Sequence, residues 1–169
     1  MSAARLFRTF NVSLSSGFLL RLALAASFFS VCGVGGNEKK SPDPWPASRT
    51  IQPADLAREL AEKKQTPPTV AYVGFHTLFA GGHIPGASFH GSASTEPGLA
   101  ELKKWAGSLP RSANLVLYCG CCPFERCPNI RPTFTALDNM GFKRLRVLVL
   151  PTSFAKDWVD KGFPIQKGM

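Results

Sequence analysis

The sequence predicts an α/β fold, a single domain in which helices flank a central, mostly parallel sheet. Short runs rich in aliphatic residues alternate along the chain with segments of helical spacing, which is typical of parallel sheets. The chain has 169 residues, 44% of them hydrophobic and 18% charged, which is enough apolar material for one core. In such a fold, ligands bind beyond the carboxyl ends of the strands.

Residues 1–32 differ in composition from the rest of the chain and predict an export signal. Their only charged residues are three arginines, and an uncharged apolar run follows Arg21 and ends at Cys32. A basic start and a short apolar run are the layout of a signal peptide, and this run is shorter than the roughly 20 residues of a membrane span. The stretch FSVC is similar to a lipobox, in which Cys32 would be lipidated, although Val31 departs from the preferred small residues.

We therefore expect an exported protein, either periplasmic or attached through its N-terminus to the outer side of the cytoplasmic membrane. Ordinary cleavage near Cys32, or an uncleaved anchor, is the alternative to lipidation. The net charge of +9 comes from 20 basic and 11 acidic residues, and the basic ones are scattered in pairs. This distribution predicts a solvated surface that favours small anions and no nucleic-acid partner.

The first elements follow a segment rich in Gly and Pro. Residues 33–49 predict an extended linker, so the domain is expected to occupy residues 50–169. Pro53 suits the first turn of a helix over 53–64, whose leucines share one face. Residues 69–73, TVAYV, come after two prolines and predict a buried strand.

The middle of the chain predicts short elements joined by tight turns. Residues 75–79 are expected to form one helical turn, and the sequence GGHIPGA at 81–87 forces a reversal into a short strand at 87–89. Residues 97–106 place three large apolar side chains at helical spacing. Gly107 ends that helix.

The run LVLY at 115–118 is the most strand-like in the chain, and it places Cys119 at the end of a strand. After a loop, Asn129 is expected to cap a helix that Gly141 ends. Two further elements are expected after it, a buried strand at 145–150 and a short helix at 154–159.

A cysteine at the end of a strand, in a loop that leads to a helix, is a candidate nucleophile. Backbone N–H groups in such a loop stabilise a thiolate and any anion bound beside it. The plain structural alternative is that Cys119 is a small buried apolar residue, as free cysteines often are.

Three segments in fixed order resemble the rhodanese-like family. They are GGHIPGA at 81–87, LVLYCG at 115–120 and WVDKGFP at 158–164, and the resemblance extends over roughly 50–167. It implies a sulfurtransferase without a cofactor, in which Cys119 takes sulfur from a small sulfur-containing anion as a persulfide. The sulfur would then pass to a thiol or to cyanide.

The resemblance also assigns roles to other residues. The loop positions Gly120, Cys121, Cys122 and Arg126 are expected to bind the anion, the last by its charge. Arg131 is a second candidate for attracting the anion. Two further sets are expected to be structural: His83 and Gly86 in the turn, and Trp158 in the core. No motif supports His76 or His90.

The sequence departs from the family pattern in three places. Tyr72 and Gly74 stand where the family usually has Asp and Arg, and Pro151-Thr152 replaces the usual Gly-Gly before the last helix. The loop from Gly120 to Pro128 is longer than expected. A phosphatase or arsenate reductase on this fold would need arginine six residues after the cysteine, but Glu125 stands there.

The loop contains more sulfur than one nucleophile needs, and this leaves three interpretations open. Cys121 or Cys122 could form a disulfide with Cys127 or resolve a persulfide on Cys119, in a thiol–disulfide redox protein. The four thiols could instead bind Cu(I) or Zn(II). A binding module without catalysis is the third interpretation.

Overall fold

The structure is a computed structural model, and it describes residues 42–62 and 66–168. The predicted signal, the lipidation candidate Cys32 and most of the predicted linker lie outside the described residues. Within the described ranges, no helix is long and apolar enough to cross a membrane.

One sheet forms the centre of the described domain, and every strand pair in it is parallel. The strand order is β1-β5-β4-β2-β3, so β4 lies in the middle. This confirms the predicted α/β class. The strands are β1 (Thr50–Ile51), β2 (Thr69–Tyr72), β3 (Ser88–Phe89), β4 (Asn114–Tyr118) and β5 (Arg144–Leu148).

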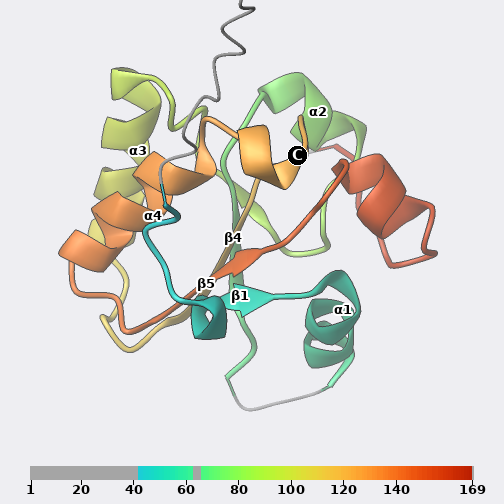
Figure 1. Cartoon of the computed structure of the whole chain (residues 1–169), viewed down its shortest axis with the longest axis horizontal. Helices are drawn as coiled ribbons and strands as arrows, with labels where there is room; N and C mark the ends of the chain where they lie inside the picture. The colour runs from blue at the N-terminus through green and yellow to red at the C-terminus, as the bar shows by residue number, and fades with distance from the viewer. Residues whose placement is uncertain (1–41, 63–65, 169) are drawn as a thin grey trace, which may run out of the picture. The chain divides into compact units, whose positions relative to one another are not determined.

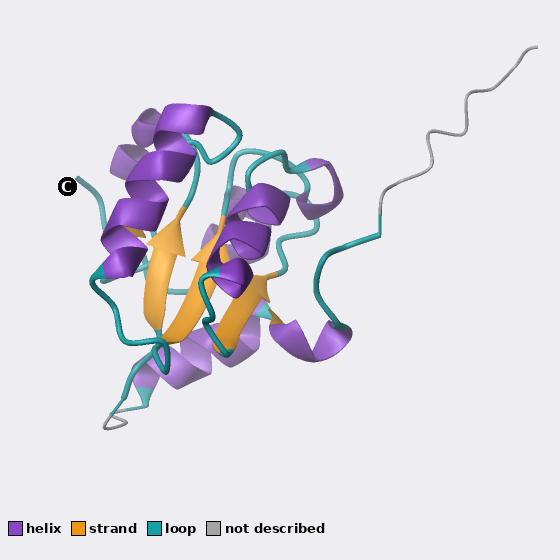
Figure 2. Ribbon diagram, turned by 90° about the vertical axis from the view of Figure 1, so that its left-hand side faces the viewer, coloured by secondary structure: helices purple, strands orange, loops and turns teal. Residues whose placement is uncertain are grey.

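Helices cover both faces of the sheet (Figures 1 and 2). In Figure 1, α3 and α4 lie on one side, whereas α1 and the C-terminal helical turn η3 lie on the other. The α-helices are α1 (Pro53–Ala61), α2 (His76–Gly81), α3 (Glu96–Gly107) and α4 (Ile130–Asn139). The shorter turns are η1 (Ala47–Arg49) and η2 (Phe124–Arg126), both 3-10, and η3 (Ala155–Val159), which is π-helical.

The central strand β4 divides two apolar cores. Leu115 and Leu117 belong to the core that also contains residues of α3 and α4, whereas Val116 and Tyr118 belong to the core with residues of α1 and α2. All four side chains are fully buried. Burial on both faces explains the continuous apolar run in the sequence, because each buried aliphatic side chain contributes about 2 kcal/mol.

The strand β1 was not predicted, since two residues are too short to show a period. Thr50 and Ile51 pair with Val147 and Leu148 of β5, so their conformation depends on a strand almost 100 positions later. Propensity alone does not determine such an edge strand.

The packed domain begins before Thr50, which corrects the predicted linker boundary. Trp45 is 8% exposed, and its ring centroid lies 5.1 Å from that of Phe134 and 5.8 Å from that of Phe124. Asp43 forms an ion pair with Arg131 at 2.5 Å. The end of the Pro-rich segment is therefore part of the core, because Trp45 contributes a buried aromatic side chain. In the sequence, Trp45 lies between two prolines, a context that suggested a linker.

We expect Trp45→Ala to lower the free energy of unfolding by about 3 kcal/mol, because it removes a large buried side chain between two aromatic rings. Chemical denaturation followed by circular dichroism measures the change. Trp45→Phe is the matched variant and should keep most of the stability. A loss below about 0.5 kcal/mol for the alanine variant, as at a surface position, would show that this segment is only a tether.

Candidate active site

Cys119 immediately follows β4, at the carboxyl end of the sheet. The preceding carbonyl, that of Tyr118, accepts a hydrogen bond from the N–H of Val73 at 2.9 Å, so the backbone is held in the sheet up to this point. The side chain of Cys119 is only 5% exposed. The sheet therefore delivers a buried sulfur to the edge where parallel α/β folds bind ligands.

Hydrogen-bond donors around this sulfur stabilise its thiolate form. The thiols of Cys127 and Cys121 donate to it, as do the backbone N–H of Cys121 and the side-chain amide of Asn129, whose Nδ2 lies 3.5 Å from Sγ. Together these donors lower the pKa of Cys119 to about 6, against the opposing effect of burial. Cys119 is therefore mostly a thiolate at neutral pH, which is the nucleophilic form.

Cys127 remains a thiol and acts as a donor. It is 3% exposed, and its pKa is raised, first because its thiol donates to Cys119 and then because it is buried. The backbone N–H groups of Asn129 and Ile130 contact its sulfur. The start of α4 thus reaches Cys119 through Cys127, whereas the loop N–H of Cys121 contacts Cys119 directly.

None of the four loop cysteines is in a disulfide. The Sγ of Cys121 lies 3.2 Å from that of Cys119 and 3.3 Å from that of Cys122. These three sulfurs lie within 4.8 Å of one another, close enough to meet at one soft cation. Cys127 interacts with Cys119, and it is not joined by a disulfide to Cys121 or Cys122, the partners that the sequence suggested.

Asn129 has a role that the sequence did not reveal. It was expected to cap α4, but its side chain makes no capping hydrogen bond. Its Oδ1 accepts hydrogen bonds from Ser92 Oγ at 2.8 Å and from the N–H of Ser94 at 2.9 Å, and these bonds aim its Nδ2 at Cys119. The only signal in the sequence was a polar residue next to a helix start, which suits a cap equally well.

The long loop contains one regular turn, η2, at Phe124–Arg126. The N–H of Phe124 donates to the carbonyl of Leu150 at 3.0 Å, and its ring packs against Trp45. At the start of the loop, a Cβ on Gly120 would lie 2.5 Å from the Cβ of Phe154, so only glycine fits this close approach. Backbone and aromatic contacts anchor the loop at both ends.

The pair that replaces the family's Asp and Arg is uncharged. Tyr72 donates a hydrogen bond from its hydroxyl to the carbonyl of Phe75 at 3.3 Å, and burial is the main cause of its raised pKa. A Cβ on Gly74 would lie 2.7 Å from that hydroxyl. The tyrosine thus occupies the space that a side chain at position 74 would need.

The HIPGA turn is tied to the C-terminal segment. His83 is 2% exposed, its Nδ1 donates to the carbonyl of Phe79 at 2.9 Å, and its backbone exchanges two hydrogen bonds with Gln166. Gly86 has φ +75° and donates its N–H to the Gln166 side chain. Trp158 is fully buried, and its Nε1 donates to the carbonyl of Pro164.

The two arginines expected to attract the anion differ in their surroundings. Arg131 pairs with Asp43, donates to the carbonyl of Cys127 and lies over the ring of Trp45, so it fixes the start of the domain to the loop. Arg126 is exposed and lines a surface pocket beside Pro123.

The two remaining histidines lie near aromatic rings. The ring of His90 stacks on Trp105 at 3.8 Å, and burial lowers its pKa to about 4. His76 is exposed, with its ring 5.1 Å from that of Phe89.

An apolar pocket of about 430 Å³ adjoins the start of the loop. Gly120, which lies between Cys119 and Cys121 in the chain, lines this pocket together with Tyr72, Phe154 and Lys167. Its other lining residues include the exposed apolar side chains of Leu78, Val159 and Ile165.

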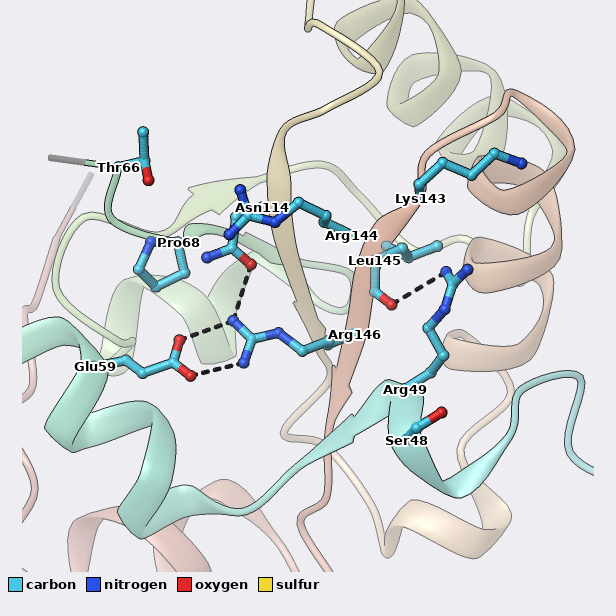
Figure 3. A pocket seen from close by; sticks show the side chains of 10 residues that line it. All are labelled: Ser48, Arg49, Glu59, Thr66, Pro68, Asn114, Lys143, Arg144, Leu145 and Arg146. Carbon is cyan, nitrogen blue, oxygen red and sulfur yellow. Dashed lines mark hydrogen bonds and ion pairs between the residues drawn. The ribbon is translucent and has the colours of Figure 1, made fainter. Parts of the chain in front are cut away.

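A second pocket lies at the amino ends of β4 and β5, the opposite edge of the sheet (Figure 3). Basic side chains line it, but Arg146 is bound by both carboxylate oxygens of Glu59 at 2.8 Å and by Asn114 at 2.9 Å. Arg49 donates to the carbonyl of Leu145. Since no cysteine lines this pocket, its charged pairs support the sheet rather than the sulfur site.

Solved structures with a similar fold belong to rhodanese-like proteins. The BH2092 protein from Bacillus halodurans matches with a TM-score of 0.56 at 17% identity, over 71% of this chain and 77% of its own. A crystal structure of the Alr3790 protein from Anabaena matches with a TM-score of 0.54 at 18% identity, over 69% of this chain and 82% of its own. The rhodanese-like domain of the same Anabaena protein, solved by NMR, matches with a TM-score of 0.51 at 19% identity, over 70% of this chain and 79% of its own.

The described domain therefore has the rhodanese-like fold, which confirms the resemblance seen in the three sequence segments. The chain matches no protein-family model, and no curated protein matches it significantly. At identities below 20%, these neighbours establish the fold, and the chemistry has to be argued from the cysteine site.

Alkylation of Cys119 by iodoacetamide should follow a pH profile with its midpoint near pH 6, far below the ordinary value of 9.0 for a cysteine pKa. The rate falls below the midpoint because the thiol predominates there and only the thiolate reacts. Peptide mass mapping of the labelled cysteine, at several pH values, measures the profile.

Cys127→Ala removes the donor with the largest effect on the pKa of Cys119. It should raise the midpoint by on the order of one pH unit or more. A midpoint near 9.0 in the unaltered protein would show that the donors do not stabilise the thiolate.

Proposed function

We propose that the domain is a sulfurtransferase that moves sulfane sulfur through a persulfide on Cys119. The observation that carries the proposal is the buried Cys119 sulfur at the carboxyl end of β4, whose thiolate is stabilised by the thiol of Cys127, the N–H of Cys121 and the amide of Asn129. The rhodanese-like fold supports the same reaction class. Together they favour a soft nucleophile in a site that accepts negative charge.

The donor is a small anion that contains sulfane sulfur, such as thiosulfate. The Cys119 thiolate attacks the outer sulfur, the S–S bond of the donor breaks, and sulfite leaves with the bonding electrons. A persulfide remains on Cys119. A thiol or cyanide then attacks its outer sulfur, and the Cys119 thiolate leaves with the electron pair.

The donors that stabilise the resting thiolate also suit both steps. Negative charge lies on the Cys119 sulfur before and after the transfer and on the outer sulfur between them. The amide of Asn129 and the N–H of Cys121 are neutral donors already in place, so they stabilise the charge without reorganisation. The site has Glu125 at the position where phosphoryl or arsenate chemistry needs arginine, which disfavours that chemistry.

A second candidate function is thiol–disulfide exchange without net sulfur transfer. The contact of 3.2 Å between the sulfurs of Cys119 and Cys121 favours it, because a thiolate beside a thiol needs little movement to form a disulfide. The two functions differ in whether sulfur from the donor becomes bound to the protein.

We also propose that the protein is exported and acts on the outer side of the cytoplasmic membrane, with Cys32 as a lipid attachment site. The arginines and the apolar run of residues 1–32 support the proposal. Attachment at Cys32 would leave the domain on a tether rich in Gly and Pro.

Cys119→Ser should abolish the formation of thiocyanate from thiosulfate and cyanide, because a serine hydroxyl is not ionised at neutral pH. The unaltered protein should gain about 32 Da on treatment with thiosulfate and the variant should gain nothing, as a persulfide on one sulfur requires. Circular dichroism and thermal unfolding check that the variant is folded. Full turnover in a folded Cys119→Ser protein would exclude this nucleophile.

Cell fractionation should find the protein outside the cytoplasm, in a form that begins at or close to Cys32. Mass spectrometry of the N-terminal peptide distinguishes lipidation from ordinary cleavage, because only a lipidated Cys32 carries acyl chains. A full-length soluble product in the cytoplasm would contradict export.

A further inference from the structure

Cys121 places a second thiol against the proposed nucleophile. Its sulfur lies 3.2 Å from that of Cys119, with only Gly120 between them in the chain. Transfer to an external acceptor requires no such neighbour. The contact therefore bears on what happens to the persulfide once it has formed.

We propose that Cys121 is a resolving cysteine that discharges the persulfide within the loop and releases sulfide. The sulfur of Cys121 attacks the inner sulfur of the persulfide, Sγ of Cys119, and the bond from Sγ to the outer sulfur breaks. A disulfide forms between Cys119 and Cys121, the outer sulfur leaves with the electron pair, and it takes the Cys121 proton as HS⁻. The two cysteines lose two electrons and the sulfane sulfur gains them, so the step needs no other reagent.

The geometry favours Cys121 over the other two thiols of the loop. Cys127 is buried, and the backbone N–H groups of Asn129 and Ile130 contact its sulfur. The sulfur of Cys122 contacts Cys121 and is one step further along the loop. Cys121 alone combines direct contact with Cys119 and partial exposure.

The charge on Cys119 determines which step comes first, the reaction of Cys119 with the donor or the attack by Cys121. In the resting site, burial and the neighbouring thiolate raise the pKa of Cys121, so it is held as a thiol while Cys119 reacts with the donor. Formation of the persulfide moves the negative charge to the outer sulfur, away from Sγ. Cys121 then loses the repulsion that kept it protonated.

The inference rests on the proposed function and specifies the reagent that completes its cycle, which is an external dithiol. The loop supplies its own electrons for one release of sulfide, and an external dithiol must then reduce the disulfide between Cys119 and Cys121. Because Cys121 is partly exposed, a dithiol reductant can attack its sulfur from solvent. The reduced cluster is then ready for the next donor.

A single-turnover experiment on the mature protein tests the inference. The fully reduced protein, freed of reductant, is mixed with thiosulfate without oxygen, and free sulfide and intact mass are measured. We expect close to one equivalent of sulfide and a product about 2 Da lighter than the reduced protein, with the disulfide mapped between Cys119 and Cys121. Added dithiol should restore the starting mass.

Cys121→Ser should keep a persulfide, about 32 Da heavier, and release no sulfide until an external thiol is added. It should still form thiocyanate when cyanide is present, because cyanide attacks the outer sulfur directly. Cys122→Ser is the comparison variant, since it removes a thiol of similar exposure from the same loop. Whatever its effect on the rate of reaction with the donor, the persulfide that it forms should be discharged as the disulfide between Cys119 and Cys121, with one equivalent of sulfide for each persulfide formed.

The outcomes distinguish a failure of the resolving role of Cys121 from a failure of sulfur transfer through Cys119. An unaltered protein that keeps the heavier persulfide and releases no sulfide overturns the resolving role and leaves sulfur transfer intact. A disulfide to Cys127 that survives in Cys121→Ser also overturns it. If the unaltered protein forms neither thiocyanate nor sulfide from thiosulfate while it remains folded, the proposed function fails as well.

Discussion

A buried thiolate has to be surrounded by hydrogen-bond donors, and this requirement governs how the parts of the domain meet. Cys119 is 5% exposed, so water does not solvate its charge, and burial alone would favour the neutral thiol. The donors come from Cys127, from the backbone of Cys121 and from Asn129. Each belongs to a different part of the chain between β4 and α4, so the site exists only when strand, loop and helix are packed together.

The contacts that hold the donors are mainly backbone and aromatic. Phe124 anchors the loop to the end of β5 and to Trp45, and Phe154 packs against Gly120 at the start of the loop. Serine hydroxyl and backbone groups at Ser92 and Ser94 aim Asn129 at Cys119. The groups that contact the Cys119 sulfur are thus amides and thiols, and in the proposed reaction such groups suit a soft, polarisable sulfur donor.

The sulfurs of Cys121 and Cys127 next to Cys119 make both sulfur transfer and disulfide exchange chemically feasible at one site. In the proposed reaction Cys127 and Cys121 contact the same nucleophile but differ in exposure, and this difference separates a donor from a resolving thiol. An oxidising compartment suits such a site, since disulfides persist there and external dithiols control their reduction. The proposed export and the proposed discharge of the persulfide are therefore chemically compatible.

The sequence by itself determined the local features. The apolar run of β4 predicted a buried strand ending at Cys119, and the alternation of such runs with helices predicted the parallel sheet and, with the HIPGA turn, the rhodanese-like fold. These features follow from periodicity and turn chemistry, which neighbouring residues express.

Only the tertiary structure decided which groups meet at the sulfur. Asn129 looks like a helix cap in the sequence and Trp45 like part of a linker, yet one contacts Cys119 and the other supports its loop. Four cysteines in one loop allow many pairings, and the contacts that Cys127 and Cys121 make with Cys119 depend on how the loop packs between β5 and α4. Such contacts arise from packing between distant segments, and no local pattern records them.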